Sequence, residues 1–157
     1  MTVASLREIK AELDSLHPKR VQELCLKLAR FRKENKELLS YLLFEAQDEN
    51  TYINDVKAGM DQLFGEVKKG NNYLVKKSIR KILTMTNKYI RYSGSKQTEV
   101  ELLIHFCRKL RKTGIPLHAT GSMGNLYQRQ LLKINKSLAS LHEDLQYDYS
   151  EELKSLK

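Results

Sequence analysis

Cysteine, proline and glycine are scarce in this chain. Its 157 residues include two cysteines, two prolines, seven glycines and no tryptophan. Two cysteines are too few for a disulfide framework, and because both lie in apolar segments we expect buried thiols in a reducing compartment, the cytoplasm. Few glycines and prolines, together with abundant Leu, Lys and Glu, favour helices over strands.

Long hydrophobic runs are also missing. No stretch approaches the roughly 18 apolar residues that a membrane-spanning helix needs. The N-terminus lacks the basic and then apolar pattern of a signal peptide. We therefore expect a soluble protein with no membrane partner. Hydrophobic residues still make up 41% of the chain, which is enough to build a core, so disorder is not expected.

Helix start and stop signals divide the chain into six or seven segments. A capping box of Ser5 and Glu8 begins the first helix, and Pro18 begins the second. A weak break in the sequence RKEN, residues 32–35, precedes the third. We expect Asn50 to cap the fourth helix and Gly70 to end it.

The second half of the chain shows the same kind of signals. A basic helix is predicted from about Asn72 to just before Gly94. Thr98 and Glu101 form another capping box, and the helix that they open closes at Gly114. This helix is apolar on several sides, which is typical of a central helix. One long final helix follows the expected cap Ser122, because apolar residues keep a three-four spacing in the set Tyr127, Leu131, Ile134, Leu138, Leu141 and Leu145.

Short connections place successive helices as antiparallel neighbours. The sequence therefore predicts an all-α fold, a single domain of about six to seven antiparallel helices over residues 1–145. Residues 146–157 are expected to be an acidic C-terminal tail or an extension of the last helix. A helical bundle is the first choice, and a short superhelix of the HEAT or armadillo kind is the alternative. The apolar seam of the final helix either packs inside or pairs two chains as a homodimer.

Positive charge is unevenly distributed along the chain. There are 28 Lys and Arg against 19 Asp and Glu, a net charge of +9. Residues 67–136 hold 16 cations and two acids, whereas residues 1–66 are net −2 and residues 137–157 net −3. Such asymmetry indicates an anionic partner for one part of the surface.

The basic helix carries much of this charge. Residues 73–92 include six cations and no acid. On an ideal helix the cations fall within an arc of about 140°, and most apolar side chains lie opposite. Lys76 with Arg80 and Lys77 with Lys81 are like-charged pairs at i, i+4, which repel each other weakly. A solvated helix normally alternates acids and bases. We therefore expect negative charge from another source to offset the repulsion among these cations.

This negative charge has two possible sources. Between Glu66 and Glu99 nine cations occur without an acid. Acids elsewhere in the fold, such as Asp48, Glu49 and Asp55, would offset them, or an external polyanion would.

Further cations extend the candidate surface. Arg129, Lys133 and Lys136 share one face of the final helix, opposite its apolar seam. Another cluster lies at 108–112, where cations also complement the macrodipole at a helix C-terminus. We predict a polyanion-binding surface of ten residues: Lys76, Lys77, Arg80, Lys81, Lys88, Arg91, Arg108, Lys112, Arg129 and Lys133.

No catalytic or metal-binding constellation is visible. The four histidines are scattered, and Glu101 and His105 share a helix face without the second Glu-x-x-His pair of di-iron bundles. The loop GIPLHATGSMGN, residues 114–125, lacks the Gly-Lys-Ser/Thr ending of a phosphate loop. We predict no enzymatic activity, no cofactor and no metal.

These observations favour a non-enzymatic helical module that binds a polyanion, nucleic acid in particular. Recognition would be directed at the backbone, because no base-reading signature occurs. Tyr73 and Tyr92, near the ends of the basic helix, are candidates for stacking on bases. The alternative function is a helical protein-protein interaction scaffold, or a homodimer, with an acidic protein partner.

Overall fold

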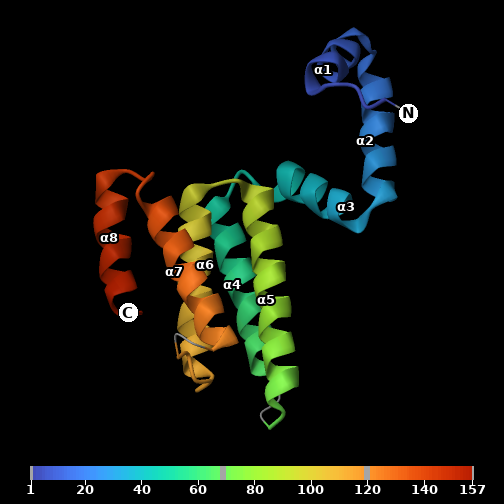
Figure 1. The fold of residues 1–157 in the computed structure, drawn as a ribbon. Helices are drawn as coiled ribbons and strands as arrows, with labels where there is room; N and C mark the ends of the chain where they lie inside the picture. Colours follow the sequence, from blue (N-terminus) through green and yellow to red (C-terminus); the bar gives the residue numbers. More distant parts are fainter. Residues whose placement is uncertain (1, 68–69, 119–120, 157) are drawn as a thin grey trace. The chain divides into compact units, whose positions relative to one another are not determined.

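The structure is a computed structural model that describes residues 2–67, 70–118 and 121–156. Within these residues the regular structure consists of eight α-helices and one short π-helical turn, without strands (Figure 1). The all-α prediction is confirmed. The chain divides into two compact units, Met1–Phe44 and Glu45–Lys157, which we describe one at a time. None of the described helices is both long and apolar enough to cross a bilayer.

The first unit consists of amphipathic helices whose apolar faces are at most half-buried. Its elements are α1 (Leu6–Ser15), α2 (Pro18–Phe31) and α3 (Lys33–Ser40), followed by the π-helical turn Tyr41–Glu45 at its boundary. Ser5 and Glu8 form the predicted capping box, and Pro18 is the first residue of α2, as predicted. No residue of these three helices is buried.

A corner joins α2 to α3. The helical path breaks at Arg32, whose backbone is extended with φ −143° and ψ 145°, inside the weak break predicted at residues 32–35. Asn35, in the same predicted break, holds the corner, because its side-chain amide donates a hydrogen bond of 2.9 Å to the Leu28 carbonyl. Cys25 lies in α2 and is exposed, so the prediction of two buried thiols is wrong for this residue.

The second unit is a bundle of five helices. They are α4 (Glu49–Gly65), α5 (Asn72–Ser93), α6 (Lys96–Lys112), α7 (Ser122–Leu138) and α8 (Glu143–Lys154). Successive helices run in alternating directions, so α5 and α7 run the same way (Figure 1). α6 packs against all four others, and its Val100, Leu103 and Phe106 are completely buried. α6 is therefore the central helix that its apolar composition predicts.

The beginning and end of α4 differ from the prediction. Asp48 rather than Asn50 is the N-cap, because its carboxylate accepts a hydrogen bond of 3.0 Å from the Thr51 amide. The helix ends at Gly65, five residues before the expected end at Gly70. Gly70 does adopt a positive φ of 126°, but it belongs to the connection that leads into α5.

The start of α6 also differs. Ser95 is the N-cap and accepts a hydrogen bond of 3.3 Å from the Thr98 amide, so the predicted capping box of Thr98 and Glu101 is wrong. The Thr98 hydroxyl instead donates to the Glu49 carboxylate across the bundle. The Thr98 side chain, which local spacing predicts to be a helix cap, thus forms a tertiary contact.

The predicted long final helix is two helices. α7 ends at Leu138, and His142 caps α8 by accepting a hydrogen bond of 3.4 Å from the Asp144 amide. The seam residues of α7 are buried within the unit: Tyr127, Leu131, Ile134 and Leu138.

Residues 146–156 lie mostly in α8 and pack on the bundle. Tyr149, Leu153 and Leu156 are buried, and Tyr127 donates a hydrogen bond of 2.7 Å to the Leu156 carbonyl. The boundary expected after residue 145 therefore falls inside α8, and the described part of this segment belongs to the second unit.

Candidate functional site

The basic helix forms as predicted. α5 covers Asn72–Ser93, and the Asn71 side chain begins it by accepting hydrogen bonds from the amides of Tyr73 and Leu74 at 2.9 and 3.3 Å. Gly94 ends it in the left-handed conformation with φ 68°, which glycine adopts without steric cost. Local signals therefore determine both ends of this helix.

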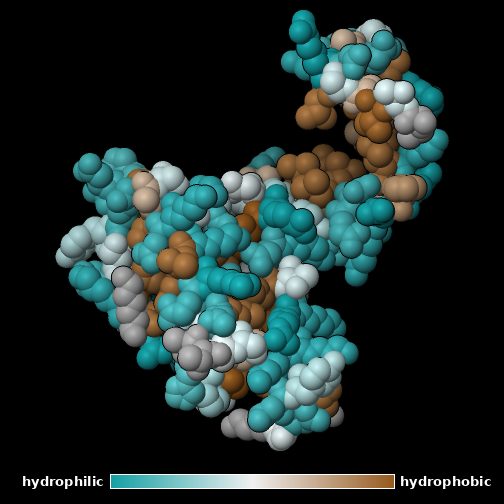
Figure 2. All heavy atoms as spheres, viewed as in Figure 1, coloured by the Kyte–Doolittle hydropathy of each residue, from teal (hydrophilic) through white to brown (hydrophobic). Residues whose placement is uncertain are grey.

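The two faces of α5 have different environments. The buried face meets α4 and α6 and consists of Val75, Ile79, Ile82, Thr86 and Ile90. On the other face Lys77, Arg80, Lys81 and Arg91 are exposed, and Lys76 and Lys88 are half-buried. The surface over α5 is accordingly mostly hydrophilic (Figure 2).

Five of the six cations of α5 form no ion pair with any residue that the structure describes: Lys76, Lys77, Arg80, Lys81 and Arg91. The acids proposed to offset them form no ion pair with these five cations. Asp48 caps α4, Glu49 accepts hydrogen bonds from the hydroxyls of Ser93 and Thr98, and Asp55 is exposed. Lys68 and Lys69 of the nine-cation segment lie outside the described residues.

The tyrosine rings near the basic face of α5 either pack on one another or lie at the end of the helix. Lys88 sits over the Tyr89 ring at 5.1 Å from its centroid. The Tyr89 ring meets those of Tyr52 and Tyr92 at centroid distances of 6.5 and 5.9 Å. Tyr73, at 69% exposure, is the more accessible of the two tyrosines proposed to stack on bases.

α7 brings a second row of cations beside α5. The Lys133 ammonium donates a hydrogen bond of 2.9 Å to the side-chain oxygen of Asn87 on α5. On an ideal helix Asn87 falls at about 20° when Lys76 is at zero, which is inside the basic arc. By helical spacing Arg129 and Lys136 lie one turn on either side of Lys133, on the same face of α7.

Lys133 also belongs to a buried polar network. Glu99 of α6 is 6% exposed and accepts hydrogen bonds from Ser137 at 2.5 Å and from Lys96 at 2.9 Å. Its other oxygen pairs with Lys133 at 2.9 Å. Burial opposes ionisation of Glu99, but the bonds from these three donors outweigh it and lower the pKa to about 2. Lys133 is thus partly neutralised within the fold, whereas Arg129 is exposed without an ion pair to any described residue.

Arg108 and Lys112 lie apart from the other eight candidates. On an ideal helix they fall about 180° and 220° from Glu99, so they leave α6 on the side away from Lys133. Arg108 pairs with Glu152 of α8 at 2.9 Å. The structure therefore brings Lys133 to α5, with Arg129 one turn away on the same face of α7, and it does not bring Arg108 or Lys112 to them.

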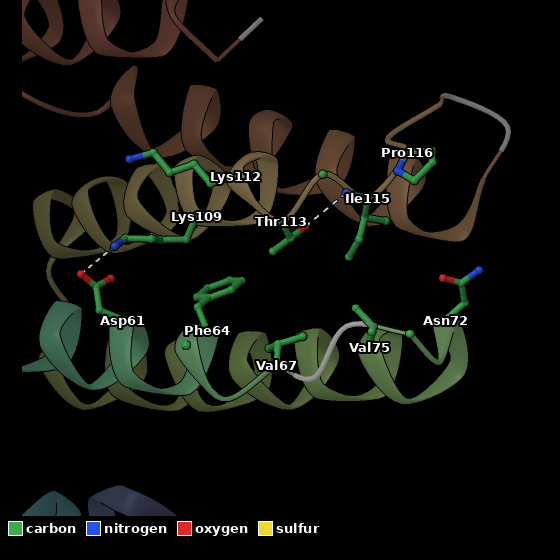
Figure 3. Close-up of a pocket in the computed structure, with 13 residues that line it drawn as sticks. Asp61, Phe64, Val67, Asn72, Val75, Lys109, Lys112, Thr113, Ile115 and Pro116 are labelled. Atoms are coloured by element: carbon green, nitrogen blue, oxygen red, sulfur yellow. Dashed lines mark hydrogen bonds and ion pairs between the residues drawn. The ribbon is translucent and has the colours of Figure 1, made fainter.

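A pocket of about 480 Å³ opens between the ends of α4 and α6 (Figure 3). Phe64, Val75 and Ile115 supply apolar walls. Lys109 crosses it to pair with Asp61 at 2.8 Å, whereas the amino group of Lys112 points away from the cavity. Asp61 and Lys109 therefore neutralise each other, and neither of these two charges needs a ligand.

Candidate catalytic groups are engaged in the fold. Asp61 also meets His105 at 2.6 Å, and burial lowers the pKa of His105 more than this carboxylate raises it. Glu101 pairs with Lys57 at 2.7 Å and accepts a hydrogen bond from Tyr149. Burial raises the pKa of the Cys107 thiol to about 12, so it stays protonated at neutral pH. No three His, Cys, Asp or Glu side chains converge as a metal site within the described ranges.

Asn87 is the residue of the candidate surface that sequence reasoning missed. It is uncharged, so a search for cations passed over it, although its angular position places it inside the basic arc.

Comparison of the chain with models of protein families, with curated proteins and with solved structures finds no match.

Proposed function

We propose that this protein is a non-enzymatic helical module that binds a polyanion, nucleic acid in particular, through the exposed face of α5 and the adjoining row of α7. The carrying observation is that Lys76, Lys77, Arg80, Lys81 and Arg91 share one face without an ion pair to any described residue. Phosphates of a polyanion would supply the missing counter-charge and release condensed cations.

The surface favours contacts to a phosphate backbone over base reading. Its cations form two rows, one on α5 and one on α7, which suits phosphates that repeat at regular spacing. Of the two tyrosines predicted to stack on bases, Tyr92 contacts the Tyr89 ring, and Tyr73 lies at one end of the basic face. Duplex nucleic acid is therefore the first partner to test. We place this activity in the cytoplasm, since Cys25 and Cys107 are both free thiols.

The test is fluorescence anisotropy with a labelled DNA duplex over a series of salt concentrations. Five phosphate contacts give a slope of about −4.5 for log K against log salt, at 0.9 per contact. In the double variant Lys77→Glu with Lys81→Glu, two contacts are lost and the slope falls to about −2.7 or shallower. Single-stranded DNA and RNA of the same length, run beside the duplex, identify the preferred partner.

The matched control changes the same charge at a distant place. Lys10→Glu with Lys19→Glu alters two exposed lysines of the first unit and shifts the net charge by the same amount. We expect this variant to keep the slope of the unaltered protein. Salt-insensitive binding, or equal losses in the two double variants, would contradict the proposal.

A further inference from the structure

The first unit contains a groove with an apolar floor and a basic rim. It lies between α2 and α3 and encloses about 660 Å³. Leu26, Ala29, Leu39 and Leu43 line its floor. Its rim is formed by the cations Arg30, Arg32, Lys33 and Lys36, and no acid lines it.

The floor of this groove is uncovered. Leu26 and Leu43 are 45% and 57% exposed, and Phe44 at the groove's end is 79% exposed. Apolar side chains gather on the facing sides of α2 and α3 (Figure 2). Exposed apolar patches of this kind mark interaction surfaces in folded proteins.

We propose that this groove docks an amphipathic helix of a partner protein, one whose apolar residues are flanked by Asp or Glu. Apolar side chains at i, i+3 or i+4, and i+7 would pack on Leu26, Leu39 and Leu43. Carboxylates beside them would pair with Arg30, Arg32 and Lys36 at the rim, where polar contacts surround an apolar centre in protein interfaces. This interaction is independent of the function proposed for α5.

Charge argues against a second copy of the chain as the occupant. In a symmetric dimer each patch meets the same patch of the partner. Two such grooves would then place their cationic rims against each other, since Lys33 is the one rim residue that pairs with an acid among the described residues, Glu37 at 3.7 Å. Like charges across an interface oppose association.

Shape argues against a lipid surface. An amphipathic helix that lies on a membrane presents one flat or convex apolar face to the bilayer. Here the apolar side chains of two helices face one another across a corner that Asn35 holds by its bond to the Leu28 carbonyl. A helix of about 10 Å diameter enters such a concave groove, whereas a planar bilayer does not reach its floor.

The test uses a designed peptide as the probe. It is a labelled helical peptide of about 20 residues with Leu at the i, i+3, i+4, i+7 positions and Glu beside them. A matched peptide carries Lys in place of every Glu. In anisotropy with the full chain we expect the Glu peptide to bind at least about tenfold more tightly than the Lys peptide, because rim and peptide charges are opposite.

Variants locate the binding. Arg32→Glu with Lys36→Glu reverses the charge at two rim positions, and we expect it to weaken binding of the Glu peptide at least about tenfold. Leu43→Ser places a polar group on the apolar floor and is also expected to weaken binding of this peptide. Lys27→Glu with Lys10→Glu changes two exposed lysines outside the groove and leaves the affinity unchanged. The α5 variant, Lys77→Glu with Lys81→Glu, also keeps peptide binding, which separates this groove from the nucleic-acid surface.

Four outcomes would overturn the docking proposal. One is equal affinity for the Glu and Lys peptides. Another is loss of peptide binding in the α5 variant instead of the rim variant. A third is that vesicles with phosphatidylserine bind through the groove while the Glu peptide does not. The last is a dimer in light scattering that Leu43→Ser dissolves. Circular dichroism of each variant verifies that helix content is retained.

Discussion

Replacing Glu99 by Gln removes a buried negative charge without changing the shape of the side chain. In the folded protein this carboxylate accepts hydrogen bonds from Ser137 and Lys96 and pairs with Lys133. These partners come from α6 and α7, so the substitution acts on the contact between the central helix and its neighbour. Lys96 and Lys133 remain partly in solvent, at 58% and 40% side-chain exposure, and can be hydrated after the change.

The size of the effect follows from the pKa of Glu99. A fall from 4.5 in the unfolded chain to about 2 in the folded protein stabilises the fold by about 3 kcal/mol at pH 7. Because the folded pKa is depressed, this stabilisation is complete above pH 4.5 and is lost as the pH falls toward 2. At pH 3 about 1.4 kcal/mol of it remains. The amide oxygen of Gln still accepts one hydrogen bond, so we expect Glu99→Gln to cost about 2 to 3 kcal/mol at pH 7.

Urea unfolding followed by circular dichroism at pH 7 and pH 3 measures this difference. The free-energy gap between the two proteins should narrow to about 1 kcal/mol or less at the lower pH. Asp55→Asn is the matched control, since Asp55 is exposed on α4 and its change should leave stability within about 0.5 kcal/mol at both pH values. A gap that is absent at pH 7, or that is equal at both pH values, would refute the assigned role of Glu99.

Two further pairs of substitutions, each a test with its control, probe packing in the second unit by thermal unfolding. Gly124→Ala should destabilise by about 1 to 3 kcal/mol, because its Cβ would lie 1.8 Å from the His118 carbonyl oxygen. Gly59→Ala, with open space around the new Cβ, should instead stabilise by about 0.5 to 1 kcal/mol; destabilisation by both would show that the close contact is not the cause. Leu153→Ala should cost about 2 to 4 kcal/mol, because this α8 residue is 3% exposed. Leu132→Ala, at 70% exposure, should change stability by less than about 0.5 kcal/mol, and similar small effects at both positions would place α8 outside the core.

Short-range chemistry explains where sequence reading succeeded. The capping box of Ser5 and Glu8, the first-turn Pro18 and the terminal Gly94 act within a few residues of themselves, so the bounds that they predict are observed. The segregation of charge on α5 is equally local, because it depends only on the helical period.

Boundary predictions were wrong where a long-range contact competed with a local signal. Thr98 has the spacing of a cap, yet its hydroxyl bonds Glu49 of another helix. The apolar spacing of 127–145 continues across the turn before His142, because a periodic pattern does not record a change of direction. Sequence spacing reports which faces are apolar and leaves open which neighbour covers them.

The candidate site shows the same division. The sequence alone determined that six cations lie on one face of a helix, since the 100° step per residue requires it. The tertiary structure decided that Lys133 joins this face through Asn87, and that Arg108 pairs with Glu152 on another side of α6. It also decided that the apolar faces of α2 and α3 line an open groove. These outcomes depend on distances between segments far apart in the chain, and helical periodicity within one segment carries no information about them.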